Sequence, residues 1–165
     1  MFIKKVNYLY KFLIIFFLIL PINISRAEFF KDISNIITIN ENRLSYGVSV
    51  TDINSDGNNE FIVTGFGYPN LALSYIDGKL KNIIQEEIFL DRNRKTIGVA
   101  ACDLDKDGFE EIYFLNTDTY SGTKKYSDRL IDKNNNNFFD LFELKKNREN
   151  LNLTAGRSVV CVDRK

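Results

Sequence analysis

The amino-acid sequence predicts an all-β protein made of repeated four-stranded units. Two observations lead to this prediction. The stretch DLDKDGFEE at residues 103–111 repeats the pattern of DINSDGNNE at residues 52–60, so that Asp52 and Asp103 begin equivalent runs 51 positions apart. Each run also lies between short segments rich in β-branched and aromatic residues, which is typical of two strands joined by a tight loop.

The first element of the chain, residues 1–27, has the features of a signal peptide. Three lysines and no acid precede an apolar core at residues 12–20, and Ser25-Arg26-Ala27 offers small residues for cleavage after Ala27. An uncleaved membrane anchor is the alternative, but the apolar run is shorter than the ~20 residues that cross a bilayer. We therefore expect an exported protein without a stable membrane span after cleavage, comprising residues 28–165.

Four short strands are expected in each repeat of this mature chain. In the first repeat they are residues 47–51, 61–64, 70–73 and 80–83, with a turn at Asp77-Gly78-Lys79. In the second they are residues 98–102, 112–115, 128–131 and 139–141, with a hairpin tip at Asn134–Asn137. Residues 158–163 repeat the lead-in a third time. Four strands in a period of about 40–60 residues indicate a β-propeller blade, so we expect a partial β-propeller of about two blades plus the start of a third, undivided by a linker.

The composition excludes several classes of function. Removing residues 1–27 takes away four of the 22 basic residues and none of the 22 acidic ones, which leaves a net charge of −4. Such a chain is a poor candidate for nucleic acid, because phosphate binding needs clustered lysine and arginine. The chain contains no histidine, which excludes histidine-dependent nucleophilic triads and histidine-ligated zinc. Cys102 and Cys161 could pair in an oxidising compartment or be buried separately as small hydrophobes, and both options stay open.

The acidic loops have the oxygen pattern of a calcium site. Alternate side chains at positions 1, 3 and 5 converge on one point, glycine at position 6 allows a left-handed turn, and a carbonyl at position 7 and a glutamate at position 9 add oxygens. All-oxygen ligands in a flexible loop favour Ca²⁺ over magnesium, zinc or copper. The expected ligands are Asp52, Asn54, Asp56, the Asn58 carbonyl and Glu60 in the first loop, and Asp103, Asp105, Asp107, the Phe109 carbonyl and Glu111 in the second. The first loop has one charge fewer, so we expect it to bind calcium more weakly.

Two other interpretations fit these loops less well. A plain Asp-Gly hairpin turn does not explain acids at positions 1, 3, 5 and 9, repeated in phase. An EF-hand shares positions 1, 3, 5 and 6 but requires flanking helices and a glutamate at position 12, which is Val63 in one loop and Phe114 in the other.

The motif D-x-[DN]-x-D-G-x-x-E between strands resembles the FG-GAP or VCBS repeats of integrin α-subunit propellers. Residues 65–67, 128–130, 139–141 and 155–164 are similar to the cartilage acidic protein branch, whose bacterial members often carry an ASPIC/UnbV domain. The resemblance implies a seven-bladed propeller with structural calcium at the loops named above, in a protein that binds partners or matrix. Because a propeller needs about four blades to close, we expect this chain to be an N-terminal fragment, with the remainder of its propeller downstream.

The sequence therefore predicts a non-catalytic, exported calcium-binding module that binds an unknown protein or glycan. An exported propeller enzyme of hydrolase or lyase type is the alternative, with Asp91, Asp118 and Asp128 as candidate acids. We interpret these three as solvated loop charges. A nonfunctional truncated product is the third possibility.

Overall fold

A computed structural model describes residues 29–134 and 137–162 of the chain. Residues Ile33–Lys165 form one compact unit; of the other unit, Met1–Asp32, only residues 29–32 are described. The expected signal peptide and Asp163 therefore lie outside the described residues. Within the described ranges, no helix combines the length and the apolar character that a membrane crossing requires.

The described residues of the compact unit form two antiparallel sheets of four strands each, in which neighbours in sequence are neighbours in space. The first sheet contains β1 (Val48–Thr51), β2 (Glu60–Val63), β3 (Leu71–Ile76) and β4 (Lys79–Asn82). The second contains β5 (Thr96–Cys102), β6 (Glu111–Asn116), β7 (Arg129–Asn134) and β8 (Asn137–Asp140). Each strand overlaps one that the sequence predicts, and the all-β class with two four-stranded propeller blades is confirmed.

The two sheets share one hydrophobic core. Ile62 and Ala72 of the first sheet and Ile112 and Ile131 of the second belong to a single buried cluster. Phe89, on the short helix α2 (Glu87–Leu90), is fully buried in it and meets the ring of Phe114 edge to face, with centroids 5.2 Å apart. The helix lies in the connection between the last strand of the first blade and the first strand of the second. Its Phe89 therefore packs in the core that the two blades share.

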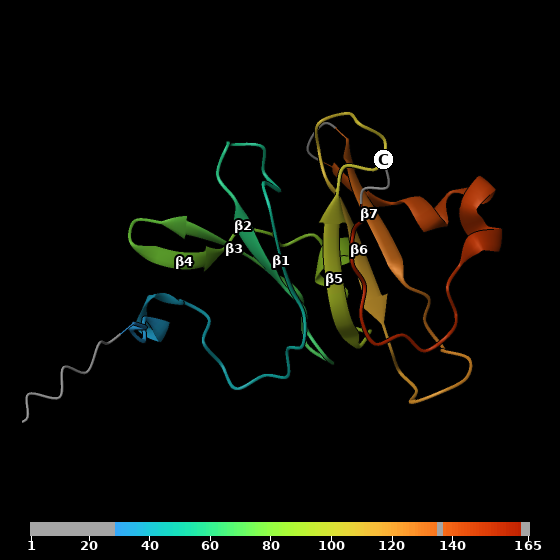
Figure 1. The fold of residues 1–165 in the computed structure, drawn as a ribbon, viewed down its shortest axis with the longest axis horizontal. Coiled ribbons are helices and arrows are strands. Elements are labelled where there is room, and N and C mark those ends of the chain that lie inside the picture. The colour runs from blue at the N-terminus through green and yellow to red at the C-terminus, as the bar shows by residue number, and fades with distance from the viewer. Residues whose placement is uncertain (1–28, 135–136, 163–165) are drawn as a thin grey trace, which may run out of the picture. The chain divides into compact units, whose positions relative to one another are not determined.

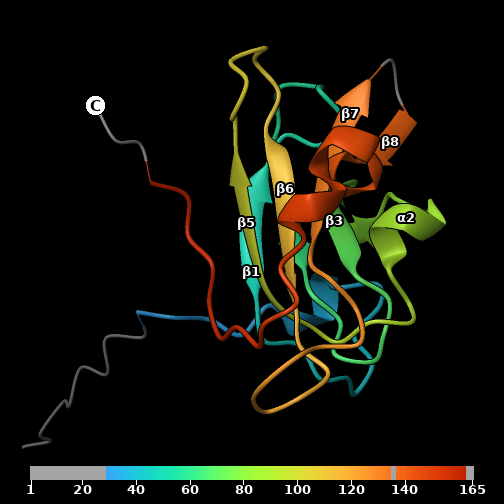
Figure 2. The ribbon, with the colours of Figure 1, turned by 90° about the vertical axis from the view of Figure 1, so that its right-hand side faces the viewer.

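The innermost strands β1 and β5 lie side by side in both views (Figures 1 and 2). Their close approach depends on glycine at the entry to β1. A Cβ placed on Gly47 would lie 3.0 Å from the Cα of Gly98, which is backbone and cannot move aside like a flexible side chain. Small residues ahead of each acidic run therefore serve the packing of successive blades.

The expected third repeat is present as an extended segment without ladder pairing at residues 158–162. It lies against the second blade, because a Cβ on Gly98 would be 3.5 Å from Val159 and Cys161 forms a disulfide with Cys102 of β5. A strand needs hydrogen-bonded neighbours to be stable, and this segment has none among the described residues. The remaining helical turns are η1 (Ser34–Ile36), η2 (Leu141–Glu143) and η3 (Lys145–Asn150), without buried residues.

Candidate metal centres

The two acidic loops lie at the same end of the two sheets, between β1 and β2 and between β5 and β6 (Figures 1 and 2). They have the same backbone course. Position 4 is left-handed in both, at Ser55 (φ 66°) and Lys106 (φ 67°), and so is the glycine at position 6, Gly57 (φ 88°) and Gly108 (φ 94°). Strands, not helices, flank both loops, which excludes the EF-hand interpretation.

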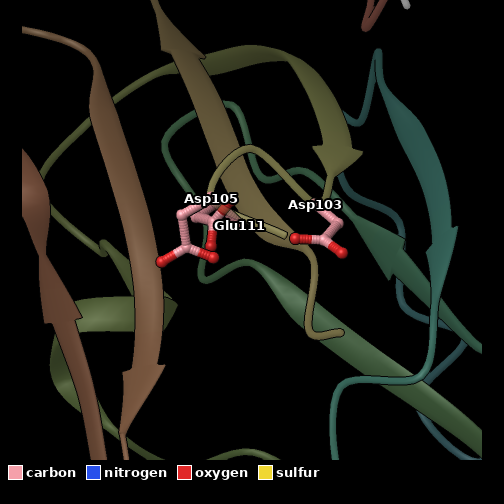
Figure 3. A group of neighbouring side chains, drawn as sticks. All are labelled: Asp103, Asp105 and Glu111. Atoms are coloured by element: carbon pink, nitrogen blue, oxygen red, sulfur yellow. The ribbon is translucent and has the colours of Figure 1, made fainter. Parts of the chain in front are cut away.

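The second loop brings three of its predicted acids together. Asp103, Asp105 and Glu111 each offer a carboxylate oxygen within 4.8 Å of the other two (Figure 3). Oxygens that bind one calcium at 2.3–2.6 Å can be at most about 5 Å apart, so this spacing fits a single ion. Asp107 lies outside the group of three and accepts a 2.8 Å hydrogen bond from the Phe109 N–H.

Glu111, at the last predicted ligand position of the second loop, is buried and hydrogen-bonds back to the start of the loop. Its side chain is buried, and its Oε2 accepts a 2.6 Å hydrogen bond from the N–H of Leu104, at position 2 of the loop. Its Oε1 is buried and has no hydrogen-bond partner. Burial, and then the negative charges of Asp105 and Asp132, raise the pKa of Glu111, because each of them disfavours its charged form.

The first loop repeats this arrangement at its last position. Glu60 is fully buried, its Oε2 accepts a 3.1 Å hydrogen bond from the Ile53 N–H, and its Oε1 is also without a partner. Burial raises the pKa of Glu60 as well, and a side-chain hydrogen bond from Ser74 to the carboxylate offsets part of this rise. An unpartnered buried carboxylate oxygen is costly, and it occurs here at the same position of both repeats.

In the first loop, the carboxylates of Asp52 and Asp56 accept hydrogen bonds from backbone N–H groups of the same loop. Asp52 accepts hydrogen bonds from the N–H groups of Asp56 (3.0 Å) and Gly57 (2.8 Å), and Asp56 accepts from that of Asn58 (2.8 Å). The bond from Asn58 lowers the pKa of Asp56. Among the described residues, the acids of this loop do not form a group as close as that of the second.

Sequence reasoning missed a further acid beside the second loop. Asp132 of β7 is half-buried, and its pKa is raised by burial and then by Asp105 and Asp107, so it faces their charges. Strand registers give it the position in the second blade that Ser74 has in the first, since Ile131 pairs with Ile112 as Leu73 pairs with Phe61. Aligning the third strands of the repeats could have revealed this difference.

The interpretation of Asp91 and Asp128 as solvated loop charges is wrong. Asp128 is fully buried and accepts hydrogen bonds from Tyr113 Oη, the Asn116 N–H, Lys124 Nζ and Asn152 Nδ2. Asp91 is 4% exposed and pairs with Arg94 at 2.6 Å and Arg129 at 3.0 Å. The sequence places both acids in loops, and this did not reveal that other segments of the chain bury them. Asp118 is half-buried and accepts from the N–H groups of Lys125 and Tyr126.

Two antiparallel four-stranded sheets with equivalent acidic loops are the arrangement that a resemblance to FG-GAP repeats implies. An FG-GAP-like repeat model matches residues 52–114, from the first residue of the first loop into β6. Within this class, the chain is similar to cartilage acidic protein 1. It is 47% identical to the Xenopus tropicalis protein over 137 residues, which covers 76% of this chain and 21% of that protein.

The Homo sapiens and Mus musculus forms of cartilage acidic protein 1 are each 45% identical, over 137 and 136 residues, again with 76% of this chain and 21% of the relative covered. These matches confirm the predicted resemblance to the cartilage acidic protein branch. The chain spans about a fifth of the length of these curated relatives.

Proposed function

We propose that the chain is a non-catalytic binding module of an exported protein, in which each acidic loop holds a structural Ca²⁺. The observation that carries the calcium proposal is the pair of buried, unpartnered Oε1 atoms of Glu60 and Glu111. A divalent cation at each loop would supply the missing partner of this oxygen and offset the repulsion among the neighbouring carboxylates.

The ligands proposed for each ion are those that the sequence indicates. In the second loop they are Asp103, Asp105, Asp107, the Phe109 carbonyl and Glu111, with Asp132 as a further nearby charge. In the first loop they are Asp52, Asn54, Asp56, the Asn58 carbonyl and Glu60. Bound calcium would fix the bend between the two inner strands of each blade.

Export is supported by the disulfide between Cys102 and Cys161. Such bonds persist in oxidising compartments and are rare in the cytosol. The expected signal peptide at residues 1–27 points to the same location, and the partner proposed for the exported module is a protein or glycan.

A binding role is favoured over catalysis by the state of the buried acids. Asp128 has all of its strong acceptor directions in use, and Asp91 is held between two arginines, so both are structural anchors. The name of the relatives, cartilage acidic protein 1, states no reaction.

Thermal unfolding with calcium and with a chelator tests the metal proposal. Ligand that binds only the folded state adds about 2.7 kcal/mol per site at a free concentration of 100 times Kd, so calcium should raise Tm by several degrees. Magnesium at the same concentration is the control and should raise it less. A Tm that is identical in calcium and in chelator would refute the calcium proposal.

A further inference from the structure

A pocket of about 390 Å³ lies at the end of the sheets opposite the acidic loops. Tyr46 precedes β1, Phe66 follows β2, Lys95 precedes β5 and residues 117–120 follow β6, so the pocket opens at the junction of the two blades. Arg157, from the segment that leads to the third repeat, completes its wall. Its volume is within the range of sites for small molecules.

The walls of this pocket are aromatic. The rings of Tyr46 and Phe66 meet edge to face with centroids 5.4 Å apart, and Tyr120, which also lines the pocket, has 87% of its surface exposed. An exposed ring at a pocket mouth offers a flat apolar face to a ligand.

The polar groups of the pocket favour an anion. The Lys95 ammonium lies 5.5 Å from the centroid of Phe66, and the Arg157 guanidinium lies 4.4 Å from that of Tyr120. Neither forms an ion pair with an acid of the described residues. Asp118, the acid of this pocket, accepts backbone N–H groups from Lys125 and Tyr126, which already balance part of its charge.

From this combination we propose that the pocket binds an acidic sugar, a ring that carries a carboxylate, as a free residue or within a glycan. The C–H face of the ring packs on the aromatic walls, and the carboxylate binds Lys95 and Arg157 through charge-assisted hydrogen bonds. The remaining lone pairs of Asp118 accept ring hydroxyls. The inference rests on the proposed binding function and names its ligand class, but it does not depend on calcium in the loops.

The test compares two probes that differ only in the carboxylate, methyl glucuronide and methyl glucoside. Each is titrated into the calcium-loaded full chain while amide signals are followed by NMR. The glucuronide should shift the signals of Phe66, Lys95 and residues 117–120, and bind roughly a hundredfold more tightly than the glucoside, as expected for two charge-assisted hydrogen bonds. Lys95→Gln removes one of these two bonds and should weaken glucuronide binding by roughly tenfold. Tyr120→Ala should weaken both probes.

Lys145→Gln, a change at an exposed lysine of η3 outside the pocket, is the matched control and should leave both affinities unchanged. Equal affinity for the two glycosides, unchanged binding by Lys95→Gln, or shifts confined to residues 103–111 would each overturn the proposal. The last result would mean that the probe acts on the acidic loop. Failure of the calcium proposal shows separately, as an unchanged Tm in chelator.

Discussion

Glu60 and Glu111 are the residues that link the fold of each blade to its chemistry. Each uses one carboxylate oxygen to accept the N–H at position 2 of its loop, and each keeps the other oxygen buried and unpartnered. The hydrogen bond fixes the shape of the loop, whereas the unpartnered oxygen destabilises the metal-free fold. A residue with these opposite effects should respond to mutation in opposite directions with and without calcium.

Glu111→Gln should therefore stabilise the chain in chelator and destabilise it in calcium. The amide keeps the acceptor for Leu104, removes the uncompensated charge and can donate to Asp103 or Asp105, which is worth about 1 kcal/mol. In calcium the variant loses a ligand, and its affinity should fall by roughly tenfold or more. Urea unfolding in both conditions measures the two effects. Glu110→Gln, at the exposed neighbour, is the control, and a loss of stability in chelator would contradict the explanation.

Asp128 is the second residue whose surroundings determine its role. It is fully buried, and Tyr113 donates a 2.8 Å hydrogen bond to it. Burial, and then this bond and the charge of Asp128, raise the pKa of Tyr113 well above its ordinary value of 10.0. The folded state therefore holds the phenol proton more tightly than the unfolded state. The resulting contribution to the free energy of unfolding is complete below pH 10 and is lost as the pH rises further.

Tyr113→Phe should lower the free energy of unfolding by about 1.5–3 kcal/mol at neutral pH, the value of a hydrogen bond to a charged group. The difference from wild type should shrink above pH 10, because only the wild type loses the contribution of the phenol proton. Denaturant unfolding between pH 7 and 11 measures it. Tyr75→Phe, at a tyrosine that is 66% exposed, is the control. A difference that stays constant to pH 11 would mean that Tyr113 ionises normally in the fold.

At the scale of elements, the loops show what the sequence can and cannot reveal. Ligand spacing and the need for glycine at position 6 are visible in the residues, since only glycine adopts that backbone without strain. The left-handed conformations of Ser55 and Lys106 were not visible, because serine and lysine rarely adopt them and the loop imposes them. Burial of the final glutamate was equally hidden, because it depends on how the loop packs against the third strand of its own blade, where Ser74 and Asp132 lie.

The two loops differ in charge, which predicts the order in which they bind calcium. The first has Asn54 where the second has Asp105, and the first blade has Ser74 where the second has Asp132. The second loop should therefore bind more tightly, and its three acids are already gathered. Exchanging the residues at position 3 of the two loops isolates the first of these two differences.

Asn54→Asp should tighten the first site and Asp105→Asn should weaken the second, each by roughly tenfold, because affinity follows the count of charged ligands. Isothermal titration with calcium on the two single variants and on the wild type resolves the sites. Asn59→Asp adds the same charge at position 8 of the first loop, which supplies no ligand, and should have a smaller effect. Tighter binding at the first wild-type site would reverse the assignment.

At the scale of the whole unit, the strands were predictable but the contacts between blades were not. Periodic apolar segments predicted all eight strand positions of the described residues, because strand pairing within a blade is local in sequence. Helix α2 was missed, because four residues carry no periodic signal and Phe89 is fixed only by the two sheets around it. Lys133 of β7, which donates 2.9 Å and 3.3 Å hydrogen bonds to the Ile53 carbonyl and to Ser55 of the first loop, depends likewise on blade packing.

The disulfide between Cys102 and Cys161 should be the strongest single constraint on this unit. It ties the inner strand of the second blade to the unpaired segment at residues 158–162, across a separation of 59 residues. Closing a loop of that length lowers the entropy of the unfolded chain and so raises the free energy of unfolding by about 4 kcal/mol. Cys102→Ser with Cys161→Ser should lose about this much in guanidinium unfolding, with calcium present throughout. Reductant should destabilise the wild type alone, whereas equal unfolding midpoints for the wild type and the variant would show that the disulfide adds nothing to the stability of the blades.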